Sequence, residues 1–528
     1  MNNNLTFKEV WKDDLLAGLI VFMIALPLSI GIATASGAPP IAGLLAAVVG
    51  GMLCGFVSGS HVTINGPAAG LIVVILHSIE SLGEGNRVLG FKLTLACIVI
   101  AGIIQIIFGI LKTGKYAALF PSSVVHGMLS AIGIIIFSKQ IHVALGVSPE
   151  SKSILGQIME IPHSVMNMNP EIALIGFLAL LISSIFPLFK NKYLKMIPAP
   201  LLAVILGIVL SFYFDLDHQH PYTFLQHTYS LGPNFLINLP TEFSTAITFP
   251  DFSKVLSSKG IIAIISIFFV ASLESLLSAV AVDKLDPYQR KSDLNKEFVG
   301  KGIANTFLGL IGGLPIIAEI VRSSANIQNN AKTRMANFFH GLFLLIFVLS
   351  VPALLHEIPL SALAGILIYV GFKLASPSTF WHTMEIGVDQ FIIFGTTVFV
   401  TLAEDLLVGV FAGLVMNFII NYFNKLSLKN TFKAEYTKIV NGDAVTFKIK
   451  GSLVFSNYYS LDKELEEVLN ENKKVVLDFE ETQYIDHSIV VKLFELTVLN
   501  PNLTLQGIEN MQGLSKHPHA AKKKQKVA

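Results

Sequence analysis

Long apolar runs separated by short polar loops dominate the pattern of this chain. From Leu15 to Ile79 the sequence contains no Asp, Glu, Lys or Arg. Because a helix needs about 20 consecutive apolar residues to cross a bilayer, we predict fourteen membrane segments, of which 66–79 and 321–331 are too short to span it. The predicted segments are 15–35, 39–57, 66–79, 92–111, 118–145, 171–188, 197–214, 260–282, 296–312, 321–331, 336–355, 359–376, 389–404 and 405–424.

The last hundred residues follow a different pattern. From about residue 433, strand-like stretches such as "AVTFKIKG" and "KKVVLDF" alternate with helix-like stretches such as "SLDKELEEVLNE" and "HSIVVKLFELTVL". This alternation predicts a small α/β domain over 433–515. The remaining residues, 516–528, are rich in Lys and are interpreted as a solvated basic tail, with contact to inner-leaflet lipid as the alternative.

Composition and charge support a membrane location. The 528 residues are 53% hydrophobic and only 14% charged, and the mean hydropathy is +0.65, values that a soluble protein of this size does not reach. The net charge of +1 gives no reason to expect nucleic acid as a partner. The loop 213–253 contains no Lys or Arg, whereas basic residues gather in alternate loops. This asymmetry predicts a multi-pass inner-membrane protein with both termini in the cytoplasm. The basic residues used for this assignment are Lys8, Lys12, Lys112, Lys115, Lys190, Lys192, Lys195, Lys284, Arg290, Lys291, Lys296, Lys332 and Arg334.

The two short segments occupy matching places in the chain. Each follows a Gly-rich helix and begins after a proline, Pro67 or Pro315. They are the third and the tenth segments, so an odd offset of seven relates them. This offset predicts an inverted repeat whose broken helices mark a transporter binding site. The alternative is that Gly and Pro only kink two packed helices.

A helix that starts within the membrane leaves N–H groups without intrahelical partners, and its dipole adds a partial positive charge at that end. Such an end is tolerated where it lines a cavity or is buried in protein. Two helix N-termini that face each other would therefore attract an anion. We expect the N–H groups of Ala68, Ala69 and Gly70 on one side, and of the segment that opens near Val321 on the other, to form this site.

Three charged residues lie at membrane depth near these breaks. Glu319 and Arg322 are three residues apart and can pair on one helix face, with Ser323 beside them. Arg322 either binds the anion, with Glu319 positioning it or competing for it, or forms a structural ion pair. Glu274 is the sole acidic residue of segment 260–282, and Ser278 lies one turn further on. A carboxyl there predicts proton or sodium coupling; the alternative is a buried carboxyl satisfied by backbone N–H groups.

Sequence motifs of enzymes are absent. The chain has no Walker motif, no nucleophile elbow and no HExxH sequence, so neither ATP-driven transport nor hydrolysis is supported. We therefore predict a protein that is not an enzyme and that needs no cofactor other than H⁺ or Na⁺ as a coupling ion. The Na⁺ would bind near Glu274.

Several longer stretches resemble the SulP anion transporters, the family of the sulfate permeases and prestin. "ALPLSIGIATASGAPPIAGLLAAVVGG" is similar to the signature of the first helix of that family, and "SLESLLSAVAVDKLD" with "GIANTFLGLIGGLP" is similar to its eighth and ninth helices. "RSSANIQNNAKTR" resembles its RSxVNxxAGxRT stretch. "VVLDFEETQYIDHSIVVKL" resembles the core of a STAS domain, and the resemblance covers essentially the whole chain.

The resemblance implies an all-α polytopic membrane protein with fourteen segments in a seven-plus-seven inverted repeat, followed by a cytoplasmic α/β STAS domain. The transmembrane domain would cover 1–428. Its core domain (helices 1–4 and 8–11) would move against a gate domain (helices 5–7 and 12–14) like an elevator, often in a homodimer. The STAS domain would bind a cytoplasmic regulatory partner. The residues that would face the substrate are Pro27, Leu28, Ala68, Ala69, Glu319, Ile320, Val321, Arg322 and Ser323, and those that would serve coupling are Glu274 and Ser278.

The chain also departs from the family pattern. Leu28 stands where many sulfate and chloride members have Gln, Arg322 stands where bicarbonate members have no Arg, and Glu319 is atypical of both patterns. Ser488 matches a serine that is phosphorylated in other STAS proteins, but Ile489 replaces the Gly that follows it, which argues against a phosphorylation switch.

We predict a secondary transporter, a symporter of a small inorganic anion such as bicarbonate or sulfate. The alternatives are an uncoupled anion channel or a chloride/bicarbonate exchanger, and a nucleobase permease.

Overall fold

The computed structural model describes residues 7–114, 120–151, 153–189, 197–238, 247–471 and 473–524. Four basic residues used above for orientation, Lys115, Lys190, Lys192 and Lys195, lie outside the described residues. The chain divides into two compact units. The first comprises Met1–Ala118 with Ile132–Leu374, and the second comprises Leu119–Ala131 with Ala375–Ala528.

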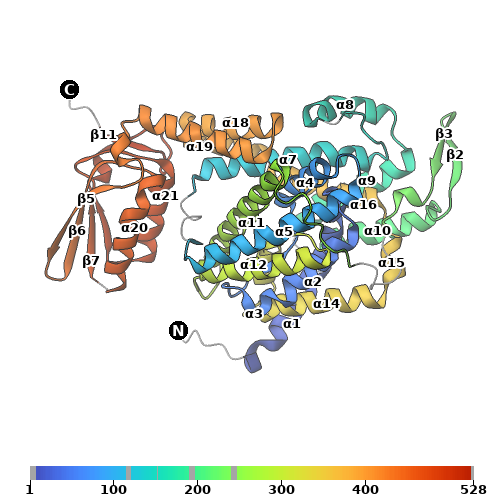
Figure 1. Cartoon of the computed structure of the whole chain (residues 1–528), viewed down its shortest axis with the longest axis horizontal. Helices are drawn as coiled ribbons and strands as arrows, with labels where there is room; N and C mark the ends of the chain where they lie inside the picture. Colours follow the sequence, from blue (N-terminus) through green and yellow to red (C-terminus); the bar gives the residue numbers. More distant parts are fainter. Residues whose placement is uncertain are drawn as a thin grey trace. The chain divides into compact units, whose positions relative to one another are not determined.

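The first unit consists mainly of helices (Figure 1). Its helices are α1 (Phe7–Ala35), α2 (Pro40–Met52), α3 (Cys54–Val57), η1 (Ala69–Leu71), α4 (Ile72–Gly83), α5 (Arg87–Ile110), α8 (Ile154–Met166), α9 (Pro170–Ile185), η2 (Phe186–Leu188), α10 (Ala199–Tyr213), α11 (Ser258–Leu285), α12 (Leu294–Ile311), α13 (Ile320–Gln328), α14 (Met335–Ser350), α15 (Pro352–His356) and α16 (Leu360–Leu374). Helix α7 (Ser122–Ala144) begins in the second unit and ends in the first.

Every predicted membrane segment contains a helix, so the predicted helical architecture is confirmed. Among the described residues, eight helices are long and apolar enough to cross a membrane. Shorter apolar helices account for further segments: Ala69–Gly83, Ala199–Tyr213, Met335–Ser350 and Val388–Ala403. The sequence did not predict the hairpin of β2 (His220–Phe224) and β3 (His227–Leu231). The amphipathic helix α8 was also missed, because Gln157, Glu160 and His163 interrupt its apolar residues and no long apolar run marks it.

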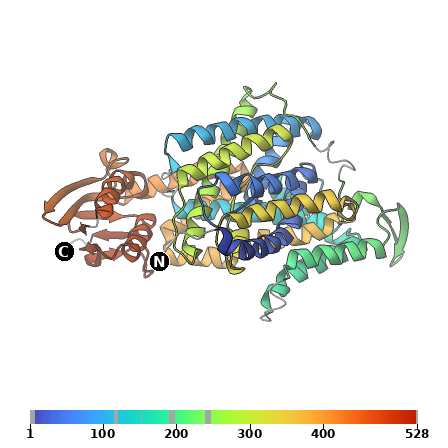
Figure 2. The same ribbon diagram turned by 90° about the horizontal axis from the view of Figure 1, so that it is seen from below.

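Glycines allow some of these helices to approach closely. Helices α5 and α12 lie side by side in both views (Figures 1 and 2). A Cβ atom added at Gly102 of α5 would lie 2.6 Å from the backbone N of Thr306, and one at Gly302 would lie 2.6 Å from the carbonyl O of Gly102. Since real Cβ atoms do not approach this closely, both glycines are required for this packing.

The two shortened segments differ from ordinary spans in what precedes each helix. Residues Ile64–Gly66 form the short strand β1, and Ile317–Glu319 form the strand β4. The two strands pair in antiparallel fashion, with Asn65 opposite Ala318. The sequence predicted both broken helices, but it did not reveal that the extended residues before them bind each other.

The second unit joins apolar helices to the α/β domain. Its helices are α17 (Pro377–Ile386), α18 (Val388–Ala403), α19 (Leu406–Phe423), α20 (Phe455–Asn470) and α21 (His487–Leu499). Its strands are β5 (Glu435–Asn441), β6 (Ala444–Leu453), β7 (Lys474–Asp478), β8 (Thr482–Ile485), β9 (Leu503–Gln506), β10 (Met511–Gly513) and β11 (Lys522–Lys524). The sheet has the order β10-β11-β8-β6-β7-β9, with β5 paired to β6.

The α/β domain has one hydrophobic core. Side chains from α20, such as Leu461 and Leu465, and from α21, such as Leu493, pack with Phe447 and Leu477 of the sheet. Strand β6 is parallel to β7 and to β8, as the alternation of strands and helices predicted.

The prediction of a solvated tail is wrong for its described part. Lys522–Lys524 form β11, which pairs with β10 and β8 inside the sheet. Ala520 and Ala521 just before this strand are buried, and the N–H of Leu514 donates to Ala521 O (2.8 Å). Composition alone suggested a solvated segment, but these small residues anchor it, and lysine side chains can lie along a surface with only their amines in water. The sheet therefore extends beyond the predicted boundary at 515.

Candidate functional site

The two half-helices begin where the paired strands β1 and β4 end. Ala68 and Glu319 occupy the N-cap positions of η1 and α13, and both have extended backbone angles. The first turn of each helix leaves N–H groups without intrahelical acceptors. Because β1 and β4 are hydrogen-bonded to each other, these two positive helix ends are held at one place in the first unit.

Polar side chains of α13, which follows the second break, form hydrogen bonds with the backbone around β1 at the first break. Arg322, Ser323 and Asn326 are fully buried on one face of the helix, and each bonds a different residue of the segment around β1. The three hydrogen bonds run from Arg322 Nη2 to Pro67 O (3.2 Å), from Ile64 N to Ser323 Oγ (2.9 Å) and from Asn326 Nδ2 to Val62 O (2.9 Å). These side chains therefore satisfy backbone groups that the broken helix leaves free.

Side chains of three neighbouring helices accept hydrogen bonds from the backbone of β1, of β4 and of the residue before β4. Three backbone N–H groups donate to side chains on α11, α12 and α14: Ala318 N to Ser275 Oγ (3.1 Å), Ile316 N to Asn305 Oδ1 (2.7 Å) and Asn65 N to Asn337 Oδ1 (3.0 Å). Asn305 also donates to Gln105 Oε1 (2.9 Å), and Gln105 donates to Ser272 Oγ (3.1 Å). The breaks thus rest on buried polar side chains from three helices, which makes their position rigid.

Arg322 and Glu319 form a buried ion pair. Arg322 Nε lies 3.0 Å from Glu319 Oε2; the Arg322 side chain is 0% exposed and the Glu319 side chain 14% exposed. The two atoms are at ion-pair distance. Neither atom makes a hydrogen bond with any of the described residues, so the interaction between them is electrostatic. A Cβ at Gly66 would lie 2.5 Å from Arg322 Nη1, so the guanidinium packs directly against that glycine.

Glu274 lies against the start of the first half-helix. Its carboxylate occupies the space that a Cβ at Gly70 would need. The Glu274 side chain is buried, and within the described part of the chain its Oε1 has no hydrogen-bond partner. Ser278 is also buried one turn further along α11. A buried carboxyl without a partner is costly and is a common feature of functional sites in membranes.

The structure places the other predicted residues around these breaks. Pro27 and Leu28 are buried in α1, which packs against α13. Ala68 and Ala69 are buried, whereas Ile320 is 42% and Val321 is 61% exposed. The exposed side chains at the second break are therefore apolar, and the guanidinium of Arg322 points into the protein.

Several buried polar residues at the breaks were not identified from the sequence, chiefly Asn305, Asn326 and Asn337. Asparagine within an apolar run is the signal that could have found Asn305 and Asn337, because polar groups at membrane depth need partners, whereas Asn326 lies in the polar stretch "RSSANIQNN". Glu297 and Lys301 of α12 were missed as well. They form a buried ion pair, and Glu297 Oε2 accepts from Gly59 N (2.9 Å) in the loop that leads to β1. Their spacing of four residues could have revealed this pair.

In the second unit, Ser488 lies in the first turn of α21. Its Oγ accepts a hydrogen bond from the N–H of Ser122 (3.4 Å).

Comparison with known proteins gives a consistent relationship. Residues 11–397 match the model of the Sulfate permease family, and residues 435–498 match the STAS domain. The bicarbonate transporter BicA of Picosynechococcus is 29% identical over 418 residues, which cover 78% of this chain and 70% of that protein. The names of such relatives agree with the prediction that this protein is not an enzyme.

Solved structures show the same fold. The transmembrane domain of a cyanobacterial BicA matches with a TM-score of 0.63 at 27% identity, covering 78% of this chain and 98% of that chain. Murine Solute Carrier 26 family member A9, described as an anion transporter in the inward-facing state, matches with a TM-score of 0.68 at 15% identity, covering 94% and 84%. Since the family model covers most of the chain and a STAS domain follows it, this protein belongs to the sulfate permease family, with a C-terminal STAS domain.

Proposed function

We propose that this protein carries a small inorganic anion, bicarbonate or sulfate, across the inner membrane by secondary transport. The observation that carries the proposal is the pairing of β1 with β4, which holds two half-helix N-termini together at one place. Free N–H groups and helix dipoles bind anions without a formal cation in contact. The family name points to sulfate and the BicA relative to bicarbonate.

The proposed binding groups are the N–H groups of Ala68, Ala69 and Gly70 and those of Ile320, Val321 and Arg322. Pro27 and Leu28 complete the wall of the site on the side of α1. Arg322 contributes a positive charge to the site although its side chain is buried. Its hydrogen bond to Pro67 O also holds α13 next to the start of the first half-helix. Ser323 also links the two half-helices, because its hydroxyl accepts a hydrogen bond from Ile64 N and donates one to Glu319 O.

Glu274 is the proposed coupling residue, with Ser278 beside it. Two carboxyls, Glu274 and Glu319, interact electrostatically in this buried region, and such a pair favours the uptake of a proton or a sodium ion. Loading of Glu274 would then change the charge next to Gly70 at the anion site. This arrangement would link the movement of the cation to that of the anion, as in a symporter.

In this proposal the domain organisation, the membrane orientation and the oligomeric state are those of the family. Helices 1–4 and 8–11 of the inverted repeat would form a core that moves against helices 5–7 and 12–14 in an elevator motion within a homodimer. Both termini would be cytoplasmic, in line with the distribution of basic loops. The STAS domain would bind a cytoplasmic regulatory partner.

The test is a panel of labelled anions in proteoliposomes, with and without a sodium or proton gradient. We expect concentrative uptake of bicarbonate or sulfate that one of the gradients stimulates, and Glu274→Gln should abolish the stimulation. The exposed acid Glu84, which follows α4 and pairs with Lys259 in the first turn of α11, provides the control: Glu84→Gln should keep the stimulation. An electrogenic current without gradient-driven accumulation would instead establish a channel.

A further inference from the structure

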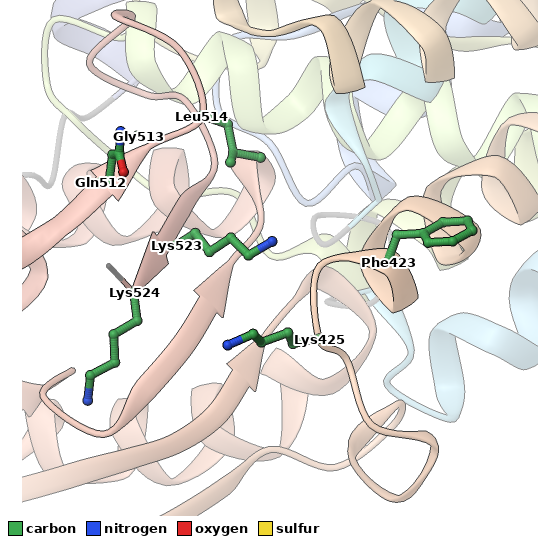
Figure 3. A pocket seen from close by; sticks show the side chains of 7 residues that line it. All are labelled: Phe423, Lys425, Gln512, Gly513, Leu514, Lys523 and Lys524. Carbon is green, nitrogen blue, oxygen red and sulfur yellow. The ribbon is translucent and has the colours of Figure 1, made fainter. Parts of the chain in front are cut away.

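A basic pocket lies in the second unit where the last apolar helix meets the sheet (Figure 3). It has a volume of about 710 Å³, within the usual range for pockets that hold a small ligand or a headgroup. Its lining residues are Phe423, Lys425, Gln512, Gly513, Leu514, Lys523 and Lys524. Lys425 and Lys523 thus come together from two segments that lie about a hundred residues apart in the chain, whereas the side chain of Lys524 extends away from them (Figure 3).

The amines of these lysines lack carboxylate partners in the described part of the chain. Lys425 Nζ donates to Gln483 Oε1 (3.3 Å), Lys523 Nζ to Asn424 Oδ1 (3.1 Å) and Lys524 Nζ to Glu480 O (2.6 Å). All three acceptors are uncharged oxygens. Figure 3 shows the chains of Lys425 and Lys523 extending toward a common space from opposite sides. The positive charge of the pocket is therefore available to an anionic ligand.

The pocket also lies at the end of a membrane helix. Phe423, the last residue of α19, is 84% exposed, and Leu514, which follows β10, is 41% exposed. Leu428 and Phe432, which follow in the linker, are 81% and 75% exposed. Large apolar side chains next to lysines at a helix end are typical of the interface between acyl chains and headgroups.

We propose that this pocket binds the headgroup of an anionic phospholipid of the leaflet that α19 meets. The phosphate would bind between Lys425 and Lys523, and the acyl chains would lie against Phe423 and Leu514. Basic clusters directly outside a membrane helix bind anionic lipids in this way. A soluble phosphate compound would use the same lysines, but it gives no role to the exposed apolar residues around them.

The pocket joins two elements that otherwise belong to different parts of the second unit. Lys425 follows α19, whereas Lys523 belongs to β11 of the sheet. A bound lipid would therefore tie the STAS domain to the last membrane helix. This proposal does not depend on the identity of the transported anion, since none of its residues belongs to the half-helix site.

The experiment uses the full chain in nanodiscs of phosphatidylcholine mixed with phosphatidylglycerol, and native mass spectrometry counts the retained lipids. The wild type should retain phosphatidylglycerol preferentially, by about fivefold or more per lysine engaged. Lys425→Gln with Lys523→Gln should lose this preference, and Lys425→Arg with Lys523→Arg should keep it. Lys429→Gln with Lys433→Gln makes the same change of charge outside the pocket and should have little effect.

Three results would overturn the proposal. An equal loss in the Lys429/Lys433 control would mean diffuse attraction to the membrane surface. Tight binding of inorganic phosphate in pure phosphatidylcholine nanodiscs, without lipid preference, would assign the pocket to a soluble anion. A photoactivatable phosphatidylglycerol should label wild-type peptides that contain Phe423 or Leu514, and labelling confined to other regions would contradict the proposal even if the glutamine variant failed to fold.

Discussion

At the residue scale, three polar side chains of the second break bind backbone groups near the first break. Arg322, Ser323 and Asn326 each contact the segment around β1. The sequence indicated the charge and the spacing of Glu319 and Arg322, and the ion pair is present. It could not indicate that the guanidinium reaches Pro67 O, because this contact spans 255 residues and depends on how the repeats fold together.

Gly70 provides the sharpest test at this scale. In Gly70→Ala, the new Cβ would overlap the carboxylate of Glu274, so either the half-helix or the acid must move. We expect loss of transport together with a decrease of about 1–3 kcal/mol in the free energy of unfolding, as for other overpacked sites. Uptake in proteoliposomes and thermal unfolding of the purified protein measure the two effects.

Gly395→Ala is the matched control, because no atom lies within 4 Å of a Cβ built at Gly395 of α18. Alanine there should leave transport unchanged and, by its better helix propensity, keep or slightly raise the stability. If Gly70→Ala transported as well as Gly395→Ala, the close packing of Glu274 against the half-helix would have no functional importance.

At the scale of elements, apolar length predicted the helices well, while short extended pieces escaped detection. Strands β1 and β4 have three residues each, with side chains that are nearly all buried, so neither alternation nor length marks them. Strand β11 consists of three lysines and resembles a tail in composition. In both cases pairing with another strand determines the structure, and the local pattern of three residues carries little information about it.

Helix α21 begins at His487, a residue whose protonation depends on folding. His487 is buried, and its Nδ1 lies 2.6 Å from His519 O. Burial lowers the pKa of this imidazole in the folded state, so the folded protein binds fewer protons than the unfolded chain. The stability that His487 contributes to the STAS domain should therefore be complete above the usual histidine pKa of about 6.5 and be lost as the pH falls below it, whereas burial raises the pKa of the neighbouring Asp486 to about 7 and acts in the opposite direction.

Hydrogen exchange of α21 and β11 in the full-length protein, followed between neutral and mildly acidic pH after correction for intrinsic rates, measures this loss. His487→Gln should remove the part of this loss that His487 causes, so the stability should decrease less toward acidic pH than in the wild type. His517→Gln, which alters a more exposed ring, should change it less. A pH dependence of the same size in His487→Gln would assign the effect to another group.

At the scale of the whole molecule, the sequence predicted a polytopic helical membrane protein with an α/β domain at its end, and the fold confirms this. The family relationship followed from motifs such as "RSSANIQNNAKTR", which contains most of α13 and the residues Arg322, Ser323 and Asn326 that hydrogen-bond to the segment around β1. The choice of anion did not follow, because helix N-termini and backbone N–H groups attract any small anion of suitable size.

The central claim is that the anion binds between the two half-helix N-termini. Val321 is in the first turn of α13 and is 61% exposed, so its side chain can be replaced without disturbing the buried network. Val321→Asp would place a carboxylate where the anion is expected, and Val321→Asn is the uncharged control of the same shape.

Uptake of labelled bicarbonate and sulfate into proteoliposomes is the most direct measurement. We expect the wild type and Val321→Asn to transport at least one of these anions, and Val321→Asp to retain about a tenth of that rate or less, since a tethered negative charge competes for the helix ends. Equal rates for Val321→Asp and Val321→Asn would contradict an anion site between the half-helices.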